Sequence, residues 1–242
     1  MSDQIHSPSS SIEAQLSKHG QVILPALLLC DFGHLDDEVK KLETAGAKAV
    51  HLDVMDGVFV PQLTYGLVVV EAVRRAASVP IEVHMMVERP DDSAIQYAKA
   101  GADIVTLHVE GLHKTKQTLT AIEAAGSQAH LAISPKTPVS RVEPFLDSCS
   151  GVLVMSVEPG FGGQTFQPSA IEKIQRLEEI RASKGYDFRI GVDGGISTKT
   201  IASVAQAGAE LIVAGSAILK QANYADALRE LETLAGKSKS CS

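Results

Sequence analysis

The chain of 242 residues contains little cysteine: Cys30, Cys149 and Cys241 form no CxxC pair and do not make a disulfide framework in a chain of this size. A reducing, cytoplasmic location is therefore expected. Basic residues are not in excess either, because 22 Lys and Arg against 29 Asp and Glu give a net charge of −7. This balance argues against an extended surface for nucleic acid or for an anionic membrane.

Long hydrophobic runs are also missing. The longest, Val22 to Cys30, contains Pro25 and is far shorter than the roughly 20 residues that span a bilayer. The polar, Ser-rich N-terminal segment lacks the basic and apolar regions of a signal peptide. The sequence thus predicts no membrane partner, and it divides into a flexible arm at 1–20, one catalytic domain at 21–235 and a tail at 236–242.

An internal repeat is present instead, in a chain whose 45% hydrophobic and 21% charged residues are ordinary for a globular protein. Ala-Gly-Ala or a near variant precedes apolar runs at Gly46, Gly101, Gly126 and Gly208, at intervals of 55, 25 and 82 residues. These intervals are near two, one and three times roughly 27 residues, the length of one strand, one helix and two connections. Glycine suits the end of each helix because it adopts the left-handed conformation without a Cβ penalty. Roughly eight such units fit, which favours a single (β/α)8 TIM barrel over an open, doubly wound sheet.

The hydrophobic pattern gives the expected elements. Short apolar runs predict strands near 22–28, 49–53, 81–86, 104–108, 128–133, 151–156, 189–193 and 211–214. Helical spacing of apolar residues predicts helices at 35–45, 91–100, 114–125, 169–183 and 198–207. The strands are almost continuously apolar, as in a parallel sheet covered by helices.

Polar residues inside these apolar strands are the first candidates for chemistry, because burying an unpaired charge is costly. His51 and Asp53 are two residues apart and therefore share one face of the second strand. His84 lies near the end of the third strand, and Asp193 ends the seventh. A lone strand histidine is more often a core residue, but two histidines and two carboxylates at one barrel mouth predict a site for Zn, Fe, Mn or Co.

Glycine-rich loops form the second group of candidates. Residues 158–164 (EPGFGGQ) follow the sixth strand, Gly194-Gly195 follows the seventh and Gly215-Ser216 follows the eighth. Such loops hold phosphate in barrel enzymes, because glycine lets the backbone approach the anion. The first loop matches G-x-G-x-x-G only in part, so we expect a phosphorylated substrate and no nucleotide cofactor.

Other polar and sulfur-containing residues near the strand ends have less specific interpretations. His108 and Glu110 end the fourth strand, where a supporting or structural role is favoured over catalysis. Met55, Met86 and Met155 lie at strand ends, where they either pack in the core or line a pocket.

Six longer strings occur together, in order, between about Ile23 and Leu219. They are 51–57 (HLDVMDG), 59–61 (FVP), 84–87 (HMMV), 154–164 (VMSVEPGFGGQ), 192–195 (VDGG) and 214–217 (AGSA). In these strings the chain closely resembles the ribulose-phosphate 3-epimerase family. The resemblance implies a ribulose-phosphate-binding barrel that interconverts D-ribulose 5-phosphate and D-xylulose 5-phosphate, an isomerase of the pentose phosphate pathway that forms homo-oligomers.

The resemblance also implies residue roles. Asp53 and Asp193 would be the two proton carriers on opposite faces of an enediolate, and both would bind the metal together with His51 and His84. Substrate contacts would be His84, Gly160, Phe161, Gly162, Gly163, Asp193, Gly194, Gly195, Gly215 and Ser216. The three methionines, Met55, Met86 and Met155, would line the pocket.

Three positions depart from the family pattern and leave the substrate open. Ala26 stands where the family usually has a serine that contacts substrate, while Gln62 and Tyr65 replace the usual Asn and Phe. The alternatives are a 3-epimerase of a ketohexose 6-phosphate such as allulose 6-phosphate, and a non-catalytic sugar-phosphate-binding paralogue. A barrel decarboxylase of the Asp-x-Lys-x-x-Asp type is disfavoured, because Met55 occupies the lysine position.

Overall fold

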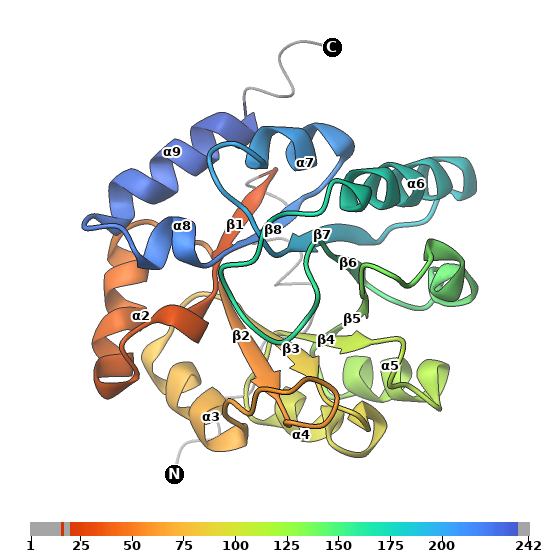
Figure 1. Cartoon of the computed structure of the whole chain (residues 1–242). Coiled ribbons are helices and arrows are strands. Elements are labelled where there is room, and N and C mark those ends of the chain that lie inside the picture. Colours follow the sequence, from red (N-terminus) through yellow and green to blue (C-terminus); the bar gives the residue numbers. More distant parts are fainter. Residues whose placement is uncertain (1–15, 17–19, 237–242) are drawn as a thin grey trace.

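The structure is a computed structural model that describes residue 16 and residues 20–236. Within this part, eight parallel strands form one sheet in the order β1-β8-β7-β6-β5-β4-β3-β2, curled into a barrel (Figure 1). The strands are β1 (Val22–Pro25), β2 (Val50–Met55), β3 (Ile81–Met86), β4 (Ile104–His108), β5 (Gln128–Ile133), β6 (Gly151–Met155), β7 (Arg189–Asp193) and β8 (Leu211–Ala214). The predicted (β/α)8 barrel is thereby confirmed. The predicted arm and tail lie mostly outside the described residues.

Helices surround the strands as an outer ring (Figure 1). They are α2 (Leu35–Thr44), α3 (Leu67–Ala76), α4 (Ala94–Lys99), α5 (Thr115–Ala124), α6 (Ser169–Lys184), α7 (Ile201–Ala207), α8 (Ser216–Leu219) and α9 (Tyr224–Gly236). The four glycines of the repeat each follow a helix, at positive φ between 97° and 117°. The prediction that they end helices is therefore confirmed.

The differences from the predicted elements have local causes. Strand β1 ends at Pro25, and the short 3-10 helix η1 (Leu27–Leu29) takes over where strand was expected to continue. Helix α4 begins later than predicted, because Pro90 starts the separate 3-10 turn η3 (Pro90–Asp92). Between β5 and β6 two 3-10 turns, η4 (Val139–Arg141) and η5 (Glu143–Phe145), replace an α-helix. Helices α3, α8 and α9 were not predicted.

The inside of the barrel is apolar on one side and polar on the other. Side chains alternate along each strand, so every second residue faces inward. The apolar inward cluster comes mainly from β1, β6 and β8, with Leu24, Leu153 and Val213 among its buried members. The buried polar side chains come mainly from β2 to β5 and include Glu82 and Thr106. This polar half supports the site described below.

The barrel ladder is incomplete between β1 and β2. There the two neighbouring strands share only the bridge between Ala26 and His51, because β1 gives way to η1. Further along β2 the segment after the strand supplies the missing partners. Thr64 Oγ1 donates to the carbonyl of Asp53 at 2.7 Å and accepts from Met55 N at 3.0 Å, and Tyr65 Oη accepts from Asp53 N at 3.1 Å. We call this stretch of β2 with Thr64 and Tyr65 the seam.

Changing Tyr65 to phenylalanine is expected to lower the free energy of unfolding by about 1–3 kcal/mol, because the backbone N–H of Asp53 loses its acceptor in a buried position. Urea denaturation followed by circular dichroism measures this difference. Tyr97→Phe is the matched control, since Tyr97 is also buried and its hydroxyl makes no hydrogen bond to the described residues. Equal losses in both variants would contradict the role of the Tyr65 hydroxyl.

Candidate active site

Four side chains predicted to act together do converge at the mouth of the barrel. His51 and Asp53 come from β2, His84 from β3 and Asp193 from the end of β7. One ligand atom from each lies within 4.8 Å of the others. Asp53 Oδ1 is 3.2 Å from His51 Nε2 and 3.4 Å from His84 Nδ1, and Asp193 Oδ2 is 3.8 Å from His84 Nδ1. The register explains the contact across strands, because Asp53 pairs directly with His84.

The far side of each histidine ring is also engaged. His51 Nδ1 lies 2.9 Å from Glu82 Oε2, and His84 Nε2 lies 2.9 Å from His108 Nε2. Both rings are fully buried, so these contacts fix their orientation. Histidines that bind metals are held in this way by a partner on the outer nitrogen.

The other ring nitrogen of His84, Nδ1, is suited to binding a metal ion. His84 Nδ1 is buried, faces both carboxylates and has no hydrogen-bond partner among the described residues. A buried polar atom without a partner is costly unless a ligand satisfies it. Two imidazole nitrogens and two carboxylate oxygens are a donor set for a divalent transition metal, so these four residues could hold such a cation.

The electrostatics of the cluster separate its acidic groups. Burial would raise the pKa of Asp53, but the neighbouring His51 and His84 rings lower it below the usual value. Burial acts likewise on Glu82, yet His51 and the hydrogen bond from Thr106 bring its pKa to about 2. By contrast, burial and the nearby negative charge of Asp53 raise the pKa of Asp193 to about 6. The two carboxyl groups thus differ in proton affinity, as in sites that use one acid and one base.

His51 shows that the cluster favours a positive charge. Burial lowers the pKa of this histidine, but the carboxylates of Asp53 and Glu82 on either side outweigh burial and raise it well above its usual value. The same carboxylates would stabilise a bound cation.

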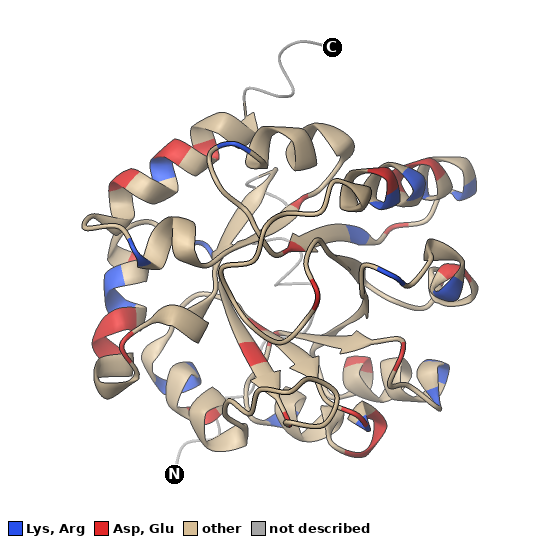
Figure 2. Cartoon of the chain, in the orientation of Figure 1, with Lys and Arg blue, Asp and Glu red and all other residues tan. Residues whose placement is uncertain are grey.

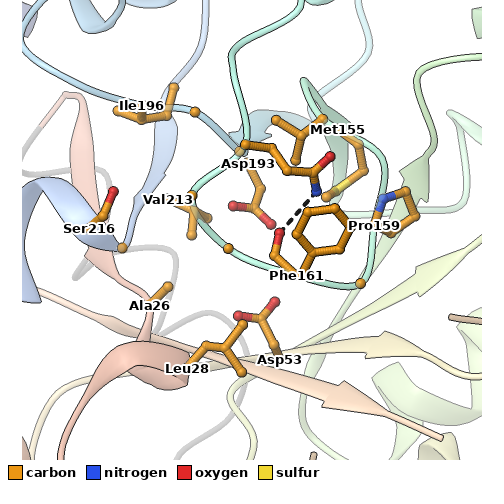
Figure 3. A pocket seen from close by; sticks show the side chains of 18 of the residues that line it. Ala26, Leu28, Asp53, Met155, Pro159, Phe161, Asp193, Ile196, Val213 and Ser216 are labelled. Carbon is orange, nitrogen blue, oxygen red and sulfur yellow. Dashed lines mark hydrogen bonds between the residues drawn. The ribbon is translucent and has the colours of Figure 1, made fainter. Parts of the chain in front are cut away.

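A pocket opens above the cluster. Asp53 and Asp193 project into it from opposite sides, with Met155, Phe161 and Ala26 around them (Figure 3). The predicted substrate contacts among its lining residues are Gly160, Phe161, Gly162, Gly163, Asp193, Gly194, Gly195, Gly215 and Ser216, together with Met55, Met86 and Met155. His84 is not on the lining and lies buried below it.

At one position in the predicted phosphate loops, the backbone conformation and the close packing both require glycine. Gly195 has a φ of 62°, in the left-handed region, and a Cβ there would lie 2.6 Å from the backbone nitrogen of Phe166. The loops after β6 and β7 therefore touch backbone to backbone. Gln164 folds the first of these loops onto itself by donating to the carbonyls of Glu158 and Phe161 at 2.6 and 2.9 Å.

Two supporting residues, Glu82 and Tyr65, were not assigned their roles from the sequence. Glu82 is two residues before His84 on the same inward face, a charged residue in an apolar strand, so its signal was available. The Tyr65 contact with Asp53 depends on the path of a loop, which no periodicity encodes. The favoured supporting role of His108 agrees with its contact to His84.

The distribution of charged residues agrees with a sequence in which basic residues are not in excess. Lys and Arg are spread over the outer helices and their connections, interspersed with Asp and Glu (Figure 2). Among the described helices, none combines the length and the apolar character that a membrane span requires.

The fold and the cluster define a TIM-barrel enzyme with a pair of aspartates and a pair of histidines at its mouth. Among solved structures, KGPDC from Streptococcus mutans aligns with a TM-score of 0.70 and 18% identity, covering 90% of this chain and 98% of that one. A 3-hexulose-6-phosphate synthase aligns with a TM-score of 0.62 and 20% identity, covering 88% and 97%. At these identities the likeness concerns the fold alone.

Similarity in sequence, in contrast to similarity in fold, identifies the family of the chain. The ribulose-phosphate 3-epimerase of Bacillus subtilis (strain 168) is 42% identical over 210 residues, 86% of this chain and 97% of that protein. The Escherichia coli (strain K12) ribulose-phosphate 3-epimerase is 39% identical over 213 residues, 88% and 95% of the two chains. The pattern of the "Ribulose-phosphate 3 epimerase family" matches residues 22–219. The chain belongs to the ribulose-phosphate 3-epimerase family and is an isomerase.

Proposed function

We propose that this protein interconverts D-ribulose 5-phosphate and D-xylulose 5-phosphate by moving a proton at C3. The observation that carries the proposal is the pair of carboxyl groups of Asp53 and Asp193, which face each other across one pocket from β2 and β7. Inversion at one carbon requires a proton to leave from one face and to return to the other. Two carboxyl groups on opposite sides of a substrate are suited to this task.

The reaction follows from the chemistry of the substrate. The hydrogen at C3 is adjacent to the C2 ketone, so one aspartate takes it as a proton while the C–H electrons form a C2–C3 double bond. The carbonyl electrons move to the C2 oxygen and give an enediolate. The other aspartate then returns a proton to C3 from the opposite face.

The difference in pKa between Asp53 and Asp193 supports roles as proton acceptor and proton donor. The lowered pKa of Asp53 favours its ionised form, and the pKa of about 6 keeps Asp193 within reach of protonation. A divalent cation held by His51, Asp53, His84 and Asp193 would stabilise negative charge as a Lewis acid and would lower the pKa of both aspartates. Met55, Met86 and Met155 line the pocket, where their apolar side chains would limit the access of water to the reacting carbon.

The phosphate group is assigned to the glycine loops. Residues 160–163, Gly194, Gly195, Gly215 and Ser216 line the pocket from the loops after β6, β7 and β8, where TIM barrels often bind phosphate. The assembly of all four cluster residues favours an enzyme over a non-catalytic binding protein. A ketohexose 6-phosphate remains the alternative substrate, since Ala26 lines the pocket without a hydroxyl.

The test is proton NMR of the metal-loaded protein with D-ribulose 5-phosphate in D₂O. We expect xylulose 5-phosphate to appear with deuterium at C3. If the pentulose is inert while allulose 6-phosphate reacts, the substrate is the ketohexose. Binding of both sugars without exchange at C3 would instead make the protein a non-catalytic paralogue.

Ala26→Ser is expected to raise kcat/KM for ribulose 5-phosphate by up to about tenfold, because one added hydrogen bond to substrate contributes about 0.5–1.5 kcal/mol. Steady-state kinetics of the two proteins measures this gain. Ala222→Ser, on the connection after α8 and outside this pocket, controls for effects of the substitution elsewhere. A lower kcat/KM for Ala26→Ser would show that the substrate requires the smaller side chain.

A further inference from the structure

A line of contacts leads from His84 away from the pocket to a residue at the rim of the barrel. His84 Nε2 lies 2.9 Å from His108 Nε2, and His108 Nδ1 lies 3.2 Å from Glu110 Oε2. The two rings are fully buried and stacked, with centroids 5.0 Å apart. A contact between two ring nitrogens is a hydrogen bond only if one nitrogen carries a proton and the other does not.

Glu110 determines which nitrogen carries the proton. An ionised carboxylate only accepts hydrogen bonds, so it selects the His108 tautomer that has its proton on Nδ1. His108 Nε2 is then unprotonated and accepts a hydrogen bond from the N–H at Nε2 of His84. With that proton held on Nε2, His84 can present an unprotonated Nδ1 toward the aspartate pair, where this atom has no hydrogen-bond partner within the described part of the chain.

Glu110 is itself held in place by the loop after β5. Its Oε1 accepts from Ser134 N at 2.8 Å and from Thr137 Oγ1, which leaves Oε2 for His108. Lys173 fixes this loop by donating to the carbonyls of Ser134 and Thr137 at 2.9 and 2.7 Å. Ser134 Oγ, 3.4 Å from His108 Nδ1, is a second and longer acceptor for the same proton.

We propose that Glu110 is a positioning residue that, through His108, holds a proton on Nε2 of His84 and so prepares Nδ1 of His84 for a divalent metal ion. This inference rests on the proposed function, because it takes His84 Nδ1 as a ligand atom. Glu110 is not among the lining residues of the pocket, and within the described part of the chain its hydrogen bonds go to His108, Ser134 and Thr137. It acts by selecting a tautomer, as partners of metal-binding histidines do.

Glu110→Gln tests the proposal with little change in shape. An amide has one accepting oxygen and one donating nitrogen. If the amide oxygen of the variant accepts from Ser134 N–H, its amide nitrogen faces His108 Nδ1. This nitrogen donates to Nδ1 and therefore favours the His108 tautomer with its proton on Nε2. Asp91→Asn is the matched control, because Asp91, like Glu110, accepts from backbone N–H and from a threonine hydroxyl; its donors are His113 N, Lys114 N and Thr118 Oγ1, and none of them is a histidine ring.

The first measurement is long-range ¹H–¹⁵N NMR of the histidine rings in metal-free protein. We expect protons on His84 Nε2 and His108 Nδ1 in the wild type and in Asp91→Asn, and a changed pattern in Glu110→Gln. An unprotonated His84 Nε2 in the wild type would overturn the proposal, even if Glu110→Gln fails to fold. So would an unchanged pattern in a folded Glu110→Gln protein.

The second measurement is zinc affinity, determined by competition with a chromophoric chelator. Glu110→Gln is expected to bind zinc about 10–100-fold more weakly than the wild type, while Asp91→Asn keeps the wild-type affinity. Equal affinities in all three proteins would contradict the role of Glu110. A wild type that binds no zinc, iron, manganese or cobalt would contradict the metal site of the proposed function instead, and the ring protonation measured without metal would still decide the role of Glu110.

Discussion

Asp53→Asn and Asp193→Asn are each expected to reduce kcat for epimerisation by about 10²–10⁴, because each change removes one of the two proposed proton carriers. Asparagine keeps the size of the side chain but neither takes nor gives a proton at C3. Coupled assays with ribulose 5-phosphate and with xylulose 5-phosphate measure the loss in both directions.

The two variants are also expected to differ from each other. Each keeps one carboxyl group, so each should exchange C3 hydrogen with D₂O in only one of the two epimers, and not in the same one. Asp91→Asn, a carboxylate outside the pocket, is the control and keeps the wild-type kcat. Full exchange of both epimers in either variant would contradict the assignment of Asp53 and Asp193 as the two proton carriers.

Removal of divalent cations with a chelator is expected to lower kcat by about 10³ or more, since Lewis-acid stabilisation contributes several kcal/mol and about 1.4 kcal/mol is a factor of ten. Adding Zn²⁺, Fe²⁺, Mn²⁺ or Co²⁺ in turn should restore activity and identify the cations that serve. The same additions should raise the melting temperature, because a ligand bound only by the folded state stabilises it.

His84→Gln distinguishes stabilisation by a metal ion in the cluster from stabilisation by nonspecifically bound cations. The variant is expected to gain little stability from added metal, since one of the four ligand groups is lost. His34→Gln is the matched control: His34 is exposed, pairs with Asp31 at 2.8 Å and lies outside the cluster. Full activity of chelated wild-type protein, with no metal detected by mass spectrometry, would contradict the metal site.

The architecture was largely predictable because its signals are local. Five of the eight strands, those at 81–86, 104–108, 128–133, 189–193 and 211–214, have the predicted bounds, since buried parallel strands are continuous apolar runs. The connection between β5 and β6 lacked such a signal, and Pro138 and Pro144 accompany the 3-10 turns found there. Helix α3 was missed although its apolar residues recur at helical spacing.

The cluster was predictable for a different reason. A charged residue or histidine in an apolar strand is conspicuous, and the alternation of side chains gives the face on which it lies. The supporting contacts were not predictable at this level, because they depend on register between strands. His84 and His108 lie on neighbouring strands, and no pattern within one strand indicates that their Nε2 atoms meet at 2.9 Å.

The incomplete ladder between β1 and β2 makes the strand that carries Asp53 an edge strand along the seam. An exposed edge offers unpaired backbone groups to any other extended chain, and proteins commonly cover such edges. Here the side chains of Thr64 and Tyr65 form hydrogen bonds with the backbone groups of Asp53 and Met55 that would otherwise be open to pairing with another strand. The same two side chains therefore protect the barrel against intermolecular strand addition at the place where its chemistry is assembled.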